Sequence, residues 1–253
     1  MSTHFFVGVD LGQSRDPSTI AVVERAEVMG PFDPVMFAYQ KLAALRLRHV
    51  ERIPLGTGYP EVVRRLAEVA RSRELTGRCR LVVDATGVGR PVVDLLRDAR
   101  PGCLVMPVVV TSGEQETSSG GYYCVPKRDL IVGLQVLMQT GGLQFAKGMK
   151  FGVELAAEMA AMEVRVSPAG REQYGAWREG AHDDLVFAVA LSCWGAAKAY
   201  PRSEEWWSSE RWVVRGGLDW EWLRNCVQLH DVQNRPGYLV HLAGETADRS
   251  AAT

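Results

Sequence analysis

The residues whose types and positions could support chemistry are carboxylates at the ends of apolar runs. Asp84 follows the run Leu81–Val83 and precedes glycines and a helix start at Pro91, a pattern typical of a buried strand that delivers one carboxylate at its end. Asp10 follows the continuously apolar run Phe5–Val9, as expected for a strand covered on both faces. Because the two strands end alike, we expect them to be neighbours.

A third acidic position is the pair Asp183 and Asp184, which opens a strongly apolar helix expected from Leu185 to about Lys198. Clustered carboxylates raise one another's pKa and resist joint ionisation unless a cation is present. An oxygen-only ligand set without a His or Cys cluster suits Mg²⁺ or Mn²⁺, and two such ions ~3.5–4 Å apart stabilise the attacking and leaving oxygens in phosphodiester hydrolysis. The alternative is structural, because Asp183 is also a good N-cap. Periodicity does not choose between the two acids, because the helix is apolar on nearly every face.

The composition indicates a globular protein large enough for one α/β domain and an appendage. The formal net charge of the 253 residues is −1, so a nucleic-acid partner would have to be held by a local basic patch. No apolar run reaches the ~20 residues of a membrane span, and no signal-peptide pattern opens the chain, so we expect a cytoplasmic protein without a membrane partner. The cysteines form no CxxC pair and are expected to be reduced core residues: Cys79, Cys103, Cys124, Cys193 and Cys226.

The expected elements begin with strands and continue with alternating helices and strands. The connection from the first strand to the apolar run Thr19–Glu24 is too short for a helical crossover, which predicts an antiparallel return. Further strands are expected at Val35–Gln40 and Leu45–Val50. An amphipathic helix from Pro60 to about Arg73 then crosses into the second acid-bearing strand, which can therefore lie parallel to the first. The remaining expectations are a helix from residue 91, a strand over 103–110, helices over 127–140 and 149–162, and a hairpin over 163–178.

Two segments have a different character. The polar stretch 112–121 is rich in Ser and Gly and lacks periodicity, so we expect a mobile loop. Residues 201–253 form a C-terminal extension that holds five of the seven tryptophans. Since aromatic side chains bury large areas, we expect this extension to pack on the 1–200 domain, with its last residues disordered. The alternative is an exposed docking element.

The order of these motifs resembles the ribonuclease H-like nuclease superfamily and, more narrowly, the nuclease domain of phage terminase large subunits. The motifs are Asp10-Leu11-Gly12, Asp84-Ala85-Thr86-Gly87 and His182-Asp183-Asp184, within about residues 5–200. The resemblance implies an α/β fold with a ribonuclease H-like mixed β-sheet flanked by helices. It also implies that Asp10, Asp84, Asp183 and Asp184 bind divalent metals and cut DNA. Some members use a further acid after the first strand, matched here by Asp16, which is equally suited to form a turn before Pro17.

The resemblance implies that the 163–178 hairpin contacts double-stranded DNA. The candidates there are Arg165, Arg171 and Arg178, with Lys127 and Arg128 as weaker ones; solvated arginines on an exposed hairpin are the alternative. No segment resembles a base-reading helix, so we expect contacts mainly to phosphates and cleavage with little sequence specificity. The sequence contains no GxxxxGK[ST] loop. We therefore expect an excised nuclease domain or a protein whose packaging ATPase is a separate chain, with small terminase or portal as further partners.

Two other functions fit parts of the sequence. Asp10-Leu11-Gly12-Gln13-Ser14 also resembles the first phosphate loop of actin-like and sugar-kinase-like ATPases, although such enzymes need a second related domain and a second phosphate loop. The chain could instead be a nuclease-like scaffold that binds DNA or proteins without cutting. Neutralising its acids would be tolerated in that case, whereas a nuclease would lose activity and keep its fold.

Overall fold

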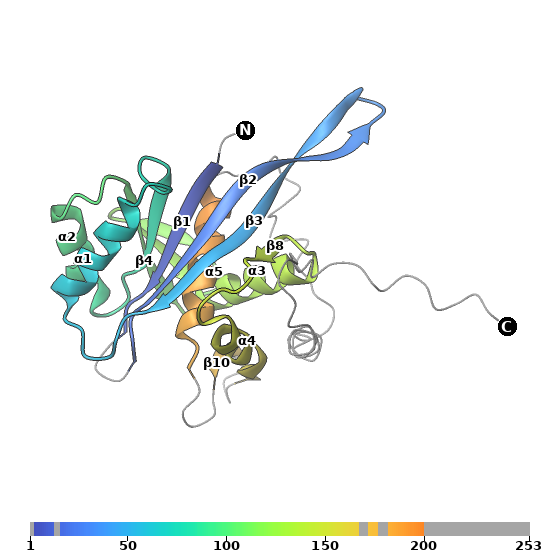
Figure 1. Ribbon diagram of the computed structural model, residues 1–253. Helices are drawn as coiled ribbons and strands as arrows, with labels where there is room; N and C mark the ends of the chain where they lie inside the picture. Colours follow the sequence, from blue (N-terminus) through green and yellow to red (C-terminus); the bar gives the residue numbers. More distant parts are fainter. Residues whose placement is uncertain (1–2, 13–15, 167–171, 177–181, 200–253) are drawn as a thin grey trace.

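An eight-stranded mixed β-sheet organises the protein (Figure 1), in the order β6-β7-β5-β4-β1-β2-β3-β8. The computed structural model describes residues 3–12, 16–166, 172–176 and 182–199; the predicted extension 201–253, with Cys226, lies outside them. The strands of the sheet are β1 (Thr3–Asp10), β2 (Thr19–Asp33), β3 (Ala38–Arg52), β4 (Cys79–Asp84), β5 (Leu104–Thr111), β6 (Thr117–Ser119), β7 (Tyr122–Pro126) and β8 (Leu143–Phe145). The expected mixed α/β fold is confirmed.

Helices cover both faces of the sheet, so the core has two parts. On one face lie α1 (Tyr59–Ala70) and α2 (Gly89–Asp98), which pack against side chains such as Val7, Val9 and Leu81. On the other lie α3 (Lys127–Gln139), α4 (Gly152–Ala161) and α5 (Asp184–Ala199), which pack against Phe6 and Val82. Because successive residues of a strand face opposite sides, a strand between two helical layers is apolar where both layers cover it, as β1 is over Phe5–Val9 and β4 over Leu81–Val83.

The central strands have the predicted directions. β1 pairs antiparallel with β2 from Thr3↔Ala26 to Asp10↔Thr19. It also pairs parallel with β4, from Phe5↔Cys79 to Val9↔Val83. The short connection and the helical crossover through α1 therefore give the directions expected from their lengths.

The strand expected at Leu45–Val50 is confirmed as part of β3, the hairpin partner of β2, whereas the strand expected at Val35–Gln40 is wrong at its start, because residues 34–37 form a turn. β2 and β3 form one long ribbon whose turn lies between Asp33 and Ala38, and the backbone N–H groups of Val35 and Met36 donate to the Asp33 carboxylate at 2.8 and 3.0 Å. Valine favours strands, but Val35 lies in the turn because the preceding residues, Asp33 and Pro34, favour turns. The ribbon extends beyond the start of β1 and projects from the sheet (Figure 1).

The polar stretch 112–121, expected to be a mobile loop, contains strand β6, which pairs antiparallel with β7. Its Glu116 accepts hydrogen bonds from Trp194 Nε1 at 3.1 Å and from Lys198 Nζ at 2.5 Å. These bonds attach the stretch to the last turns of α5. A separate hairpin of β9 (Met162–Val166) and β10 (Glu172–Ala176) matches the one predicted over 163–178.

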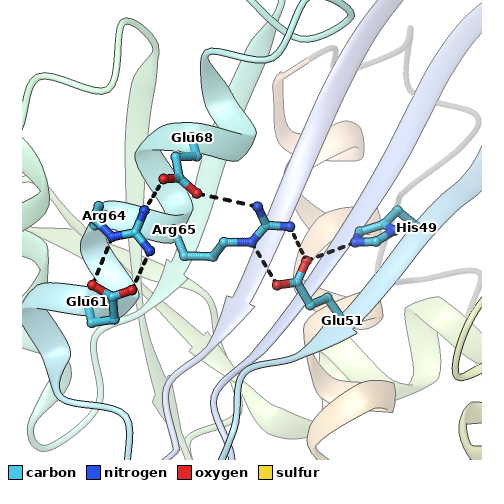
Figure 2. A network of polar contacts seen from close by, with 6 residues as sticks. All are labelled: His49, Glu51, Glu61, Arg64, Arg65 and Glu68. Carbon is cyan, nitrogen blue, oxygen red and sulfur yellow. Dashed lines mark hydrogen bonds and ion pairs between the residues drawn. The ribbon is translucent and has the colours of Figure 1, made fainter.

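A polar network joins α1 to His49 and Glu51 of β3 (Figure 2). Arg65 donates to both carboxylate oxygens of Glu51, at 2.8 Å from Nε and 2.6 Å from the terminal nitrogen. These bonds hold the pKa of Glu51 below its ordinary value. Arg64 bonds to Glu61 and Glu68 along the helix surface.

Cysteines and membrane spans can be compared with expectation only where the chain is described. Cys79 and Cys193 are buried, Cys103 and Cys124 are partly buried, and all four are free thiols. None of the helices in the described ranges combines the length and apolar character that crossing a bilayer requires.

Helix α5 lies very close to the middle of the sheet because two glycines leave room for it. A Cβ on Gly8 would stand 2.0 Å from the carbonyl oxygen of Ala188, and one on Gly195 would stand 2.4 Å from Val82 Cγ2. The Gly8 N–H donates to the Ser192 hydroxyl at 2.8 Å. The helix that begins at the acid pair is therefore held directly against the strand that ends in Asp10.

We expect Gly8→Ala to push α5 away from β1. Overpacking of this kind costs about 1–3 kcal/mol, and each 1 kcal/mol lowers Tm by about 2–4 °C in proteins of this size. Gly113→Ala is the control, because its added Cβ would meet Thr111 Oγ1 at an ordinary 3.5 Å. Thermal unfolding followed by circular dichroism measures both. Equal Tm values for wild type and Gly8→Ala would show that the contact does not determine the position of the helix.

Candidate active site

Asp10 and Asp84 lie at the same edge of the sheet. Each is the last residue of its strand, and β1 and β4 are parallel neighbours whose register pairs Val9 with Val83. The carboxyl ends of parallel strands meet at one edge, which is where α/β proteins build sites. The run before each acid, Phe5–Val9 in β1 and Leu81–Val83 in β4, is buried, so the acid is the first side chain to leave the core at that end of the strand.

The Asp183–Asp184 pair reaches the same edge from the start of α5. The carbonyl of Asp183 accepts the first helical hydrogen bond, from Phe187 N at 2.9 Å. Asp184 is buried, with 4% of its surface exposed, and accepts a hydrogen bond of 2.6 Å from the hydroxyl of Thr19. Thr19 is the partner of Asp10 in the β1–β2 ladder. The three acidic positions, far apart in the sequence, are thus brought together.

The carboxylates oppose one another's ionisation. The pKa of Asp10 is raised well above its ordinary value, first by burial and then by the negative charges of Asp84, Asp183 and Asp184. Burial also raises the pKa of Asp84, although hydrogen bonds from Thr86 act in the opposite direction. These bonds run to Asp84 Oδ1 from the Thr86 backbone N–H at 2.8 Å and from its hydroxyl at 2.5 Å.

Lys127 supplies a positive charge to this acidic edge. It is the first residue of α3 and follows β7, which pairs parallel with β5 through Thr111↔Pro126. Its Nζ lies 3.0 Å from Asp183 Oδ2 and 5.3 Å from the centre of the Phe187 ring. The same charge lowers the pKa of Asp10 and of Asp84, in partial opposition to burial. Lys127 is a predicted DNA contact, and in the structure its amine pairs with Asp183.

A second, partly buried cation contacts Asp184. Arg52, the last residue of β3, donates to Asp184 from Nε at 2.9 Å and from a terminal nitrogen at 3.1 Å. It also bonds to Glu158 of α4, whose carboxylate accepts from the backbone N–H groups of Leu185 and Val186 at 2.9 and 3.2 Å. Burial, with the charge of Asp184, raises the pKa of Glu158 to about 7.

Sequence reasoning missed Arg52 and Glu158 as parts of the site. Glu158 carried a detectable signal, because it is an acid within an apolar helical stretch whose neighbours Leu155 and Met159 are buried. An acid on that face needs a partner. Arg52 carried no such signal, since it ends an alternating strand that also bears exposed arginines.

The other candidates lie further from the acids or outside the described part of the chain. Asp16 is exposed, with its carboxylate 3.6 Å from His182 Nδ1, and His182 Nδ1 is 3.9 Å from Asp184. Arg128 bonds to Asp129 and to the carbonyl of Glu114. Arg171, Arg178 and the side chain of Arg165 are outside the described residues, so their predicted DNA contact stays a prediction.

The donor chemistry of this edge fits a hard divalent cation. Asp10, Asp84, Asp183 and Asp184 offer only oxygen, which Mg²⁺ and Mn²⁺ prefer. Burial, and then the charges of the other three acids, raise the pKa of Asp10, and a bound cation would oppose both effects. Within the described ranges, no three His, Cys, Asp or Glu side chains stand in a ready arrangement around one ion. The amine of Lys127 instead lies against one of the acids, where it neutralises part of their charge.

The fold and the site together define an α/β architecture with acids at the ends of two adjacent strands and at the start of a final helix. No protein-family model matches the chain, and a search of curated proteins also finds no match. Among solved structures, the chain is similar to the large terminase nuclease from thermophilic phage G20c with bound magnesium, with a TM-score of 0.52 and 22% identity over 76% of this chain and 81% of that one. A second structure of that nuclease gives a TM-score of 0.50 and 21% identity over the same shares. The ribonuclease H-like fold predicted from the motifs is confirmed.

We expect Asp10→Asn to stabilise the metal-free protein. The folded-state pKa of Asp10 is above its unfolded value, so stability is lost as the pH rises through the folded-state pKa. An amide cannot ionise. The variant should therefore have the higher Tm in EDTA at pH 8, and the advantage should shrink towards pH 4.

The matched control is Asp94→Asn, at an exposed acid of α2 that pairs with Arg97. It should shift Tm little at either pH, since exposed pairs contribute little. A lower Tm for Asp10→Asn than for wild type at pH 8 would contradict the charge conflict at the site.

Proposed function

We propose that this protein is a divalent-metal-dependent endonuclease that hydrolyses the phosphodiester bonds of DNA. The observation that carries the proposal is the convergence of Asp10, Asp84 and the Asp183–Asp184 pair at one edge, where their charges raise the pKa of Asp10. A protein gains no stability from such an arrangement by itself. Function accounts for it, because a cation bound there relieves the repulsion.

In this proposal Asp10, Asp84 and the acid pair hold Mg²⁺ or Mn²⁺, in a site for two ions. Divalent ions bound to such acids stabilise the attacking and leaving oxygens during phosphodiester hydrolysis. The protein's own contribution is to fix the oxygens on rigid elements: two buried strands and the first turn of α5. Thr86 supports this by donating two hydrogen bonds to Asp84. Asp16, an exposed residue between β1 and β2, is a candidate for a supplementary ligand.

Lys127 has a separate part in the proposal. For Asp183 to hold a divalent cation, the amine of Lys127 would have to give up its 3.0 Å contact with that carboxylate. The lysine side chain is long and flexible, so the displaced amine can reach the rim of the site. There it can contact a phosphate of the bound DNA, together with the arginines of the β9–β10 hairpin.

The biological setting proposed is phage genome packaging. The support is the fold, which the chain shares with a large terminase nuclease at 22% identity. The DNA would be double-stranded, and the partners would be a packaging ATPase, a small terminase or a portal, in the cytoplasm of a host. The 201–253 extension is proposed to pack on the nuclease domain, and a docking role is its alternative.

The function is tested by incubating supercoiled plasmid with the full chain in Mg²⁺ or Mn²⁺. We expect nicked and linear products with either ion and none in EDTA. Asp84→Asn should reduce cleavage by at least about a hundredfold, while the exposed-surface control Asp94→Asn should cut like wild type. Cleavage by Asp84→Asn at the wild-type rate would remove Asp84 from the catalytic set. ATP turnover without DNA cleavage would instead favour the ATPase alternative.

Cleavage is expected to show little sequence preference, because contacts to phosphates carry no sequence information. Exhaustive digestion of a long duplex followed by sequencing of the product ends gives the base frequencies around the cut. We expect weak biases spread over several positions. A sharp consensus would show that side chains read bases and would overturn this part of the proposal.

A further inference from the structure

We propose that Arg52 is a positioning residue of the site: with Glu158, it fixes Asp184 and the first turn of α5, and so sets the geometry with which the acid pair binds a cation. This inference rests on the proposed function only in taking the acid pair as cation ligands. Arg52 itself faces away from solvent for the most part, with 22% of its side chain exposed.

The contact between Arg52 and Asp184 uses both oxygens of the carboxylate. Nε bonds to Oδ2 at 2.9 Å and a terminal nitrogen bonds to Oδ1 at 3.1 Å, the two-point geometry that a guanidinium makes best. The Thr19 hydroxyl adds a bond of 2.6 Å to Oδ2. Three donors from two strands therefore determine the orientation of a carboxylate that is almost completely buried.

Glu158 extends this arrangement to the helix backbone. One of its oxygens accepts from the N–H groups of Leu185 and Val186, two of the donors that a helix N-terminus leaves without an intrahelical partner. The other oxygen bonds to Arg52. The single guanidinium thus joins the end of β3, the middle of α4 and the start of α5.

The charges show why the guanidinium is needed. Asp184 and Glu158 are two buried carboxylates facing one partly buried cation, and Glu154 of the same helix α4 adds a further negative charge near Arg52. Removing the cation leaves like charges buried together without compensation, an arrangement that proteins avoid by moving or neutralising groups. The first turn of α5 is the element that would move, because both carboxylates attach to it.

Movement of that turn would alter the cation site directly. Asp183 precedes Asp184 in the chain, and Thr19, which holds Asp184, stands opposite Asp10 across the β1–β2 ladder. Residues that hydrogen-bond to metal ligands orient them, and losing one typically costs 10–100-fold in metal affinity. Arg52 is therefore expected to act on cation binding without touching the cation.

The test measures Mn²⁺ binding to the full chain by calorimetry, without DNA, for wild type and Arg52→Met. We expect the variant to bind Mn²⁺ at least tenfold more weakly. The matched control is Arg65→Met, which removes the arginine of α1 that donates to Glu51 (Figure 2). Glu51 directly precedes Arg52 in β3, and successive strand residues face opposite sides of the sheet. Arg65→Met should lower Tm while leaving Mn²⁺ affinity within about twofold of wild type.

Several outcomes would overturn the inference. A folded Arg52→Met with wild-type Mn²⁺ affinity would do so, and so would an Arg65→Met that weakens binding as much. If Arg52→Met does not fold, Arg52→Lys and Glu158→Gln take its place. Each keeps part of the cluster, and weakened Mn²⁺ binding with intact circular dichroism supports the inference, whereas unchanged binding in both contradicts it.

The readout separates this inference from the proposed function. A wild type that binds Mn²⁺ but does not cut plasmid would refute the nuclease, while the affinity of Arg52→Met would still decide the positioning role. A wild type that cuts plasmid, with an Arg52→Met of equal Mn²⁺ affinity, would refute only the positioning role. Failure of the wild type to bind Mn²⁺ would overturn both.

Discussion

Like charges held close together are the constraint on which this structure depends. Asp10, Asp84 and the Asp183–Asp184 pair share one edge of the sheet, and their mutual repulsion, added to burial, raises the pKa of Asp10. Each member of the acid pair has its own cationic partner. Lys127 contacts the partly exposed Asp183, and Arg52 bonds to the buried Asp184. The outer cation can be exchanged for another, whereas the inner one cannot leave without exposing buried charge. An exchangeable outer position is what a site for a dissociable metal ion needs.

The rigidity of the acids comes from apolar packing. β1 and β4 are buried between two helical layers, so each presents its aspartate at a fixed point where the core ends. Helix α5 is buried over nearly its whole length and lies directly against Gly8, close enough to exclude any larger residue there. Stability and site geometry therefore depend on the same contact. The acids can repel one another without separating because the core holds their backbones in place.

Much of this arrangement could be predicted from sequence, because each acid follows or precedes an apolar run whose direction is set by its connections. The strands ending in Asp10 and Asp84, their parallel pairing and the helix after Asp184 all follow from such local patterns. The cationic partners of these acids could not be predicted from local patterns. Lys127 and Arg52 reach the acids through the register of β7 and β3, which is set by long-range pairing. The turn at residues 34–37 was missed because Val35 and Met36 carry strand-like side chains in a position that Asp33 and Pro34 define.

The central claim, that the converging carboxylates form a divalent-cation site, is tested most directly by anomalous X-ray scattering from crystals grown with Mn²⁺. We expect an anomalous peak within coordination distance, about 2.0–2.3 Å, of oxygens from Asp10, Asp84 and the acid pair, with the amine of Lys127 moved off Asp183. We also expect Arg52 to keep its bonds to Asp184 when the ion is bound. An anomalous map with no peak at this edge in saturating Mn²⁺, and with Lys127 still bonded to Asp183, would contradict the central claim.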